Sequence, residues 1–313
     1  MLANLMISVN AVVPFVFYVT AGYLTRRCGT ADEALMKKLN HLIFRVFFPF
    51  MMFSNIYASE FALQKGLRLL VFSVAGVLLL IGLLVLTVPR LVPENEKRGV
   101  LIQGIYRSNI VLFAIPLAGN VFGDAGLQLA TIPVAVVVPI YNIMAVIILE
   151  HYGRGKTGKG ELLKNVLTNP LILGTILGFA AKGIRLRLPD CLWKPVQAFG
   201  SLATPMALFV LGGTLYISAI RKNLKYLVPA LAAKLVLLPA AAAAVSVAAG
   251  FSPVERFVYL AVFATPVAAS SFPMAQSMGG DGELAGQLVA LSTVLSVFTI
   301  FGWIFVLRSA GLI

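Results

Sequence analysis

Three ionisable side chains lie inside apolar stretches of this 313-residue sequence, and all three are basic: Arg45, Arg107 and Lys234. A charge at the centre of a bilayer costs several kcal/mol (about 3 on insertion scales), so a charge kept there usually serves a function. The acidic residues all lie in loops or near the ends of apolar stretches. A cavity with buried bases and no acids predicts an anion-binding site. Arg45 and Lys234 can equally extend to a membrane interface, so Arg107 is the main candidate.

Arg107 begins the first of two runs of small polar residues, each of which contains a proline. The runs are GIYRSNIVLFAIPLAGNVFGDAG, with Pro116, and YLAVFATPVAASSFPMAQSMGGDGE, with Pro273. Proline lacks a backbone donor and clashes with the preceding turn, so we predict that each helix breaks at its proline; a simple kink is the alternative. A break exposes the positive N-terminal end of the next half-helix, and two such ends that converge form an anion site.

Polar side chains beside the two prolines complete the predicted site. Each of the neutral ones can contact a ligand or satisfy a freed backbone group, and the residue types do not separate these roles. The predicted substrate-binding residues are Arg107, Asn109, Pro116, Asn120, Thr265, Ser270, Ser271, Pro273 and Gln276. Neither histidine has a Cys, Asp or Glu partner at metal-binding spacing, and no catalytic motif is present. We therefore expect no metal, no cofactor and no enzymatic activity.

The elements that position these residues are predicted to be membrane-spanning helices. Hydrophobic residues make up 59% of the sequence and charged residues 12%, whereas a soluble domain carries about 25% charged residues. Apolar runs of about 20 residues match a hydrocarbon core of about 30 Å. The prediction is an all-α integral membrane protein with ten spans, near 5–25, 36–58, 66–88, 97–120, 125–149, 162–182, 193–217, 224–249, 254–278 and 284–307.

The distribution of charge predicts how these spans are oriented. The net charge of +13 is dispersed between the apolar runs, which indicates topology and contact with anionic lipids rather than nucleic-acid binding. Lys and Arg are more frequent in the loops on the side of the 151–164 segment. This bias predicts that the segment is cytoplasmic and that both termini lie outside, so a cysteine at Lys156 should be labelled only in permeabilised cells.

The two halves of the chain, residues 1–150 and 151–313, are predicted to be repeats of five spans each, with no soluble domain. Prolines recur at an offset of 156 or 157 residues: Pro14 and Pro170, Pro49 and Pro205, and Pro116 and Pro273. Because five is an odd number, the second repeat must be inverted relative to the first. Inverted repeats are typical of transporters, whose substrate site lies between the repeats near the middle of the membrane.

Several segments, in this order, resemble the auxin efflux carrier family, in particular its compact bacterial members described as malonate or malate permeases. They are RSN from Arg107, IPLAGNVFGDAG from Ile115, TNPLILGTILGF from Thr168, TPMALFVLGGTL from Thr204, ATPVAASSFPMAQ from Ala264, and the later GGD and STVLSV. The resemblance covers essentially the whole chain. It implies a fold similar to the bile acid sodium symporters, in which the fourth and ninth helices are discontinuous and cross.

The resemblance also implies an elevator motion, a homodimer, a crossing at Pro116 and Pro273, and substrate close to Asn109 and Ser270. Plant relatives carry indole-3-acetate and have a long central loop; here that loop is short, so plant-type auxin transport is not expected.

We predict a secondary carrier for small organic anions, mono- or dicarboxylates such as malonate or malate, in the cytoplasmic (inner) membrane. The alternatives are an anion channel, a sodium-coupled organic anion symporter, and an enzyme that acts on lipid. Without an acid at mid-depth we expect no sodium requirement, although carbonyls and hydroxyls alone can hold sodium.

Overall fold

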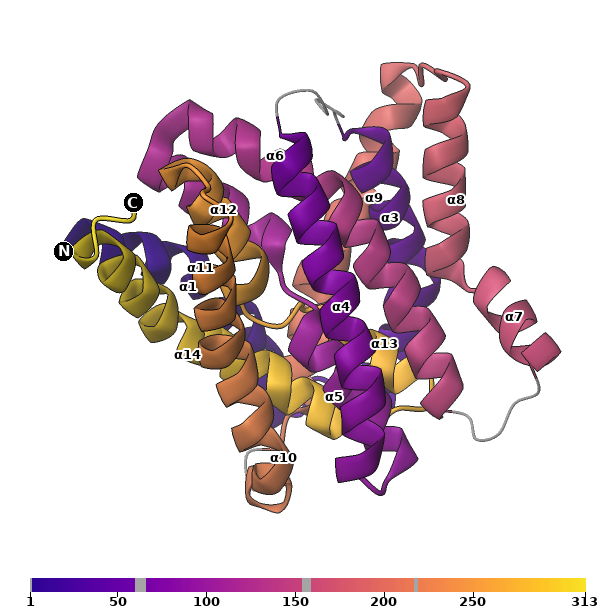
Figure 1. Ribbon diagram of the computed structural model, residues 1–313. Coiled ribbons are helices and arrows are strands. Elements are labelled where there is room, and N and C mark those ends of the chain that lie inside the picture. Colours follow the sequence, from indigo (N-terminus) through magenta and orange to yellow (C-terminus); the bar gives the residue numbers. More distant parts are fainter. Residues whose placement is uncertain (1, 60–65, 154–158, 217–218) are drawn as a thin grey trace.

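The computed structural model describes residues 2–59, 66–153, 159–216 and 219–313, and for 2–11 and 159 only the backbone (Figure 1). This part of the chain is helical and contains no β-strand, which confirms the all-α prediction. Lys156 lies outside the described residues. The helices are α1 Leu2–Arg27, α2 Glu33–Leu42, α3 Phe48–Tyr57, α4 Leu67–Leu91, α5 Asn95–Tyr106, α6 Ile110–Gly153, α7 Lys159–Leu167, α8 Pro170–Gly183, α9 Asp190–Thr214, α10 Ile220–Ala232, α11 Leu238–Ala248, α12 Pro253–Ala264, α13 Ser271–Ser277 and α14 Gly282–Ser309.

Several of these helices are long and apolar enough to cross a membrane. In the described part of the chain five pass by length and composition: Leu67–Leu91, Ile110–Gly153, Asp190–Thr214, Ile220–Ala248 and Gly282–Ser309. A sixth is the pair Gly160–Leu167 and Pro170–Gly183, if that pair, bent by 60°, is one span. The protein is therefore a multi-pass membrane protein. The count of ten spans and the two inverted repeats stay predictions.

Several helices begin at local capping signals in the sequence. Asp32, Asn169 and Asp281 accept hydrogen bonds from the first turns of α2, α8 and α14. Ser252 and Glu255 form a reciprocal capping box at the start of α12. These caps satisfy amide groups that the helices themselves leave without partners.

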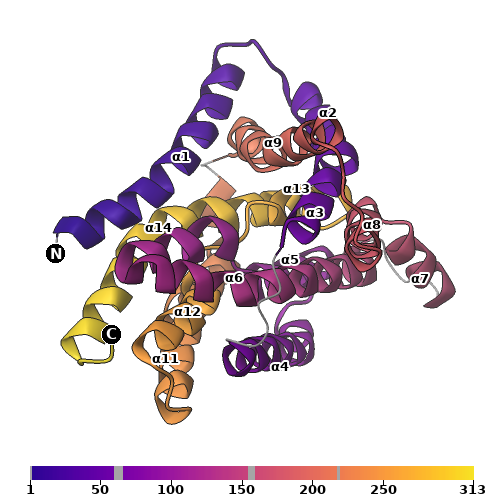
Figure 2. The same cartoon turned by 90° about the horizontal axis from the view of Figure 1, so that it is seen from above.

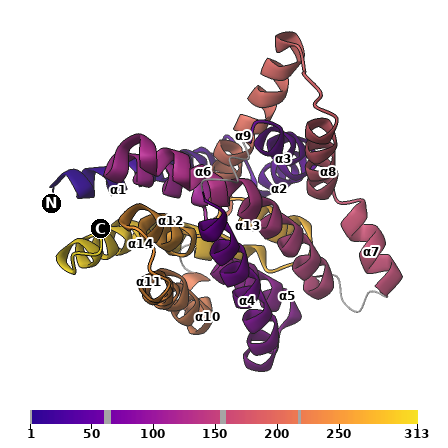
Figure 3. The same ribbon diagram turned by 45° about the horizontal axis from the view of Figure 1, so that its top comes forward.

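Apart from α7, the helices pack in two groups. The first group contains α1, α2, α3, α8 and α9: α1 packs along α9, and α3 packs along α8 and α9. The second group contains α4, α5, α6, α10, α11, α12, α13 and α14, with α12 packed between α6 and α11. Figures 2 and 3 show α2, α3, α8 and α9 gathered on one side of the molecule and α4 and α11 on the other.

Glycines allow the closest contact within the first group. A Cβ atom built on Gly22 of α1 would lie 1.8 Å from the carbonyl oxygen of Phe209, and one on Gly212 of α9 would lie 1.9 Å from that of Val19. Any larger residue at these two positions would force α1 and α9 apart. Small residues at helix interfaces are typical of membrane proteins, because association there depends on close van der Waals packing.

Two helices of the second group are interrupted, and their interruptions cross. The chain is extended from Arg107 to Asn109, between α5 and α6, and irregular from Thr265 to Ser270, between α12 and α13. Ser108 lies opposite Val267 in an antiparallel bridge. The amide of Asn109 donates to the carbonyl of Pro266 (2.8 Å), and that of Ala268 donates to the carbonyl of Arg107 (3.3 Å).

The prediction that the helices break at Pro116 and Pro273 is wrong. Pro116 lies inside α6, and Pro273 is the third residue of α13. The first four amides of a helix have no partner within it, so a proline in the first turn is tolerated and does not interrupt the helix. Pro266 lies in the interruption itself, just after the last residues of α12. It cannot donate to the carbonyl of Val262, which instead accepts the hydroxyl of Tyr141 (3.3 Å).

Candidate functional site

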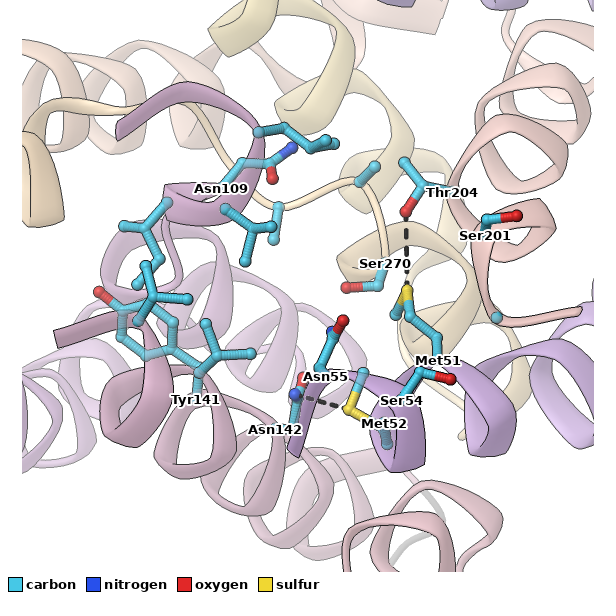
Figure 4. Close-up of a pocket in the computed structure, with 18 of the residues that line it drawn as sticks. Met51, Met52, Ser54, Asn55, Asn109, Tyr141, Asn142, Ser201, Thr204 and Ser270 are labelled. Carbon is cyan, nitrogen blue, oxygen red and sulfur yellow. Dashed lines mark hydrogen bonds between the residues drawn. The ribbon is translucent and has the colours of Figure 1, made fainter. Parts of the chain in front are cut away.

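A cavity of about 840 Å³ lies between the two helix groups, next to the crossing (Figure 4). Its floor includes Arg107, Asn109 and Ser270 of the two interruptions. Its walls come from α1, α3, the first turns and later part of α6, and α9. It extends to Ser59, just after α3, and to Gln197, in the first turns of α9. The cavity is therefore bounded by segments from both halves of the chain.

Arg107 is held at the floor of the cavity by neutral partners. Its side chain is 2% exposed. One terminal nitrogen donates to the sulfur of Met274 (2.8 Å), and the other donates to Ser270 Oγ (2.8 Å) and to Asn142 Oδ1. A guanidinium has five N–H donors, and these contacts account for three. None of the ion pairs found among the described residues involves Arg107, so its charge is without an acidic partner there.

Asn109 supplies an unused donor beside this charge. The residue is 8% exposed, and its side-chain nitrogen has no hydrogen-bond partner among the described residues. Leaving a buried donor unsatisfied costs about 1–3 kcal/mol, so a ligand or water in the cavity would remove a penalty. Asn109 also immediately precedes α6, and the first bond of that helix runs from the amide of Phe113 to the carbonyl of Asn109 (3.2 Å). The amides between these two residues form the positive end of the helix. The residues that carry them, Ile110, Val111 and Leu112, are part of the cavity lining.

Of the predicted site residues, the structure brings Arg107, Asn109 and Ser270 together at the cavity. The others lie outside its lining, and their predicted contact with substrate stays a prediction; they are Pro116, Asn120, Thr265, Ser271, Pro273 and Gln276. Some of these have structural contacts instead. The carbonyl of Ser271 accepts Gln103 Nε2 (3.0 Å), and the carbonyl of Pro273 accepts Asn40 Nδ2 (3.4 Å).

Sequence reasoning missed the residues on the remaining walls. Asn142 contacts Arg107 and is 1% exposed. Its signal was present, because it is the one side-chain amide in the apolar run VAVVVPIYNIMAVIIL. The polar wall formed by α3 and α9 also went unrecognised; it consists of Ser54, Asn55, Gln197, Ser201 and Thr204. The α9 members are spaced by four and three residues, which places them on one helix face.

Lys234 lies behind the crossing and does not line the cavity. It belongs to a π-helical segment, η4 (Ala233–Leu237), between α10 and α11. Its side chain is 1% exposed, and its ammonium group donates to Ser108 Oγ. The alternative that Arg45 and Lys234 both reach a membrane interface is therefore wrong for Lys234. The side chain of Arg45 is exposed, and its place at an interface stays a prediction.

Polar clusters away from the cavity join helices that belong to the same group. The hydroxyl of Tyr226, on α10, donates to Glu94 before α5 (2.6 Å), and this hydrogen bond lowers the pKa of the Glu94 carboxyl to about 2. The hydroxyl of Tyr216, just after α9, donates to Glu33 of α2 (2.7 Å) and also accepts from Arg26 of α1. The first cluster joins helices of the second group, and the second cluster joins helices of the first group.

Comparisons with known proteins agree with a membrane role. A family with the description "Membrane transport protein" matches residues 7–304. The chain is 25% identical over 315 residues to a protein of Rhizobium meliloti (strain 1021) named "Putative malonate transporter", with 96% of each chain covered. It is 23% identical over 313 residues to an uncharacterized transporter of Methanocaldococcus jannaschii, with 96% of this chain and 99% of the relative covered.

Proposed function

Because this chain belongs to the membrane transport protein family, that of the auxin efflux carriers, it is a membrane transporter, and we propose that it is a secondary carrier for small organic anions. The observation that carries this proposal is the buried guanidinium of Arg107 at the floor of a cavity. A buried cation with no acidic partner is costly, and a bound anion would compensate it. The unpartnered amide of Asn109 and the positive end of α6 add neutral donors for a carboxylate.

The contacts between the two helix groups support alternating access. Among the described residues, no ion pair joins the groups. In the part of the chain that the structure describes, the hydrogen bonds between them are those of Asn40 on α2 with α13, and two amide contacts to methionine sulfur, from Asn142 to Met52 (2.8 Å) and from Asn169 to Met278 (3.8 Å). A contact surface with few directional bonds favours an elevator motion of the second group against the first, since few bonds must break during each cycle.

The hydrogen bonds of Asn40 favour a carrier over a channel in this arrangement. Asn40 donates to the carbonyl of Pro273 (3.4 Å) and to Ser277 Oγ (3.2 Å), in the part of α2–α3 remote from Ser59. The cavity thus reaches toward the Ser59 end, while the groups are joined by hydrogen bonds toward the other end. This arrangement is expected of one state of a carrier. An anion channel, the alternative, would need an open path past Asn40.

The proposed function includes a substrate, a membrane location, an oligomeric state and an ion requirement. We take a mono- or dicarboxylate as substrate, with malonate as the first to test because one relative carries that name. We expect the carrier to lie in the inner membrane with both termini outside, to form a homodimer, and to need no sodium. A sodium-coupled symporter is the alternative that replacement of sodium by choline would reveal.

Counterflow in proteoliposomes tests this function. Vesicles loaded with unlabelled malonate, or with another small carboxylate from a screen, should transiently accumulate the labelled compound added outside. The accumulation should saturate with concentration and should be strongly reduced by Arg107→Gln. A current that does not saturate, without counterflow, would favour the channel; loss of counterflow in choline would favour the symporter.

A further inference from the structure

The cavity lining carries a single charge. Among the described residues that line it, Arg107 is the only ionisable group that is charged at neutral pH. Lys234 donates to Ser108 and is not part of the lining, so a molecule in the cavity cannot contact its ammonium group. A ligand with one carboxylate can therefore be paired with a cation there, whereas a second carboxylate has no cation to contact.

The wall formed by α3 and α9 is polar but neutral. Figure 4 shows Asn109 on one side of the cavity and Ser201 and Thr204 on the other, with Ser54 and Asn55 on α3 between them. Ser54 Oγ is buried without a hydrogen-bond partner among the described residues. Thr204 Oγ1 donates to the sulfur of Met51 at 3.7 Å, a weak contact that a better acceptor would replace. These groups can donate to and accept from a neutral hydroxyl or amide.

Apolar side chains make up much of the remaining lining. They come from α1, α6 and α9 and include Phe15, Val134, Val138 and Leu208. A carboxylate placed among them loses hydration that neutral hydroxyls and amides only partly replace. Burying a charge without its partner is strongly unfavourable, whereas burying a hydrogen-bonded amide is not. The cavity therefore discriminates between ligands by the charge of their far end.

We infer that the transported anion is a monocarboxylate with an apolar middle and a neutral hydroxyl or amide at its far end, and that dicarboxylates of the same length are disfavoured. This inference rests on the proposed function and narrows its substrate class. The carboxylate contacts Arg107 and Asn109, and the neutral end contacts the hydroxyls and amides on α3 and α9.

Matched pairs of ligands test the inference on the wild-type protein. Succinate is compared with succinamate, and glutarate with glutaramate, at about pH 8, where every carboxyl group is ionised. Each compound is measured both as a competitor of counterflow and by thermal stabilisation of the purified protein. The half-amide should compete at least tenfold better than its diacid.

The outcomes separate the inference from the proposed function. If the diacid competes equally well or better, the inference is wrong although the protein remains an organic anion carrier. If no carboxylate of either kind competes or stabilises, the proposed function itself fails.

A second cation on the neutral wall should reverse the preference. Ser201 lines the cavity from α9, and its hydroxyl bonds only locally, to the carbonyl of Ala198 (2.7 Å). In Ser201→Arg the ratio of diacid to half-amide affinity should rise at least tenfold. The matched control Ser201→Gln adds a neutral side chain of intermediate length and should leave the ratio unchanged. If both variants fold and Ser201→Arg does not change the ratio, the far end of the ligand does not reach this wall.

Discussion

At the residue scale the molecule depends on Arg107, which lies in an interruption between two helices rather than on a helix face. Its position lets the guanidinium contact Ser270 of the other interruption and Asn142 of α6 at once. All its partners are neutral, so they orient the group without cancelling its charge. A residue placed in this way serves the cavity more than the stability of the fold.

Arg107→Gln should therefore reduce the apparent affinity for the transported anion by about 10- to 100-fold, the effect of losing a hydrogen bond to a charged group. Counterflow measured against substrate concentration gives this value, and protein abundance in the membrane should stay near the wild-type level. Arg45→Gln is the control: Arg45 is exposed and should affect uptake little. If Arg107→Gln fails to accumulate while Arg45→Gln does, Arg107 has a structural role instead.

Lys234 is the second residue whose burial demands an explanation. Replacing it with methionine removes an unpaired buried charge while keeping most of the volume, and such exchanges are often neutral or stabilising. Lys234→Met should therefore melt at the wild-type temperature or above it, whereas transport should fall because the crossing loses positive potential. Thermal melting and counterflow on the same preparation measure both. A variant that melts much lower would show that the bond to Ser108 holds the crossing together.

At the element scale the interruptions are maintained by two different devices. Pro266 ends α12, since it removes the donor that would continue the helix and disfavours helical geometry at Thr265. No proline ends α5; there the extended chain is held by its hydrogen bonds with Pro266 and Ala268. The interruption in α12 thus supports the one between α5 and α6.

The two prolines near the second interruption should therefore differ in their effect. Pro266→Ala allows α12 to continue, since alanine is favoured over proline by about 3 kcal/mol in a helix interior, and transport should fall sharply without loss of stability. Pro273→Ala lies in the first turn of α13 and should leave transport close to wild type. Counterflow and thermal melting of both variants give the comparison. Equal losses in the two would contradict the assignment of the break to Pro266.

At the scale of the whole molecule the cavity lies between two helix groups, each of which is held together by its own polar contacts. The Tyr226–Glu94 bond lies within the second group, and the Tyr216–Glu33 bond lies within the first. Between the groups, Asn40 and α13 form the most direct polar contact on the side remote from Ser59. If the groups move relative to one another, this contact must open in each cycle.

A cross-link at this contact should therefore stop transport. The pair Asn40→Cys and Ser277→Cys, made after the two exposed native cysteines are replaced by serine, should lose counterflow on oxidation and regain it on reduction. The control pair, Asn223→Cys and Gln287→Cys, joins α10 to α14 within the second group, where the native side chains bond at 2.8 Å. Its cross-link should leave transport intact. Full transport through a completely cross-linked Asn40–Ser277 pair would rule out relative motion at this site.

The sequence by itself determined the class of the molecule and the charged end of its site. Hydropathy and the scarcity of charge predict membrane helices because each lipid-facing residue meets the same solvent whatever its neighbours are. Arg107 and Asn109 could be found for a related reason: a base and an amide inside an apolar run are costly enough to need a purpose.

Only the tertiary structure decided where the helices end, which bases are buried, and which neutral residues line the cavity together with Arg107. Whether the helix breaks at Pro266 or at Pro273 depends on the bridge between Ser108 and Val267, which are far apart in the sequence. Lys234 is buried and Arg45 exposed although both lie in similar apolar runs, because α5, α12 and α14 pack against the segment of Lys234, whereas no helix covers the side chain of Arg45 among the described residues. The neutral wall of α3 and α9 becomes a wall only when the two helix groups meet. Local sequence patterns reflect the environment that each residue favours, whereas a binding site depends on the distances between segments that packing brings together.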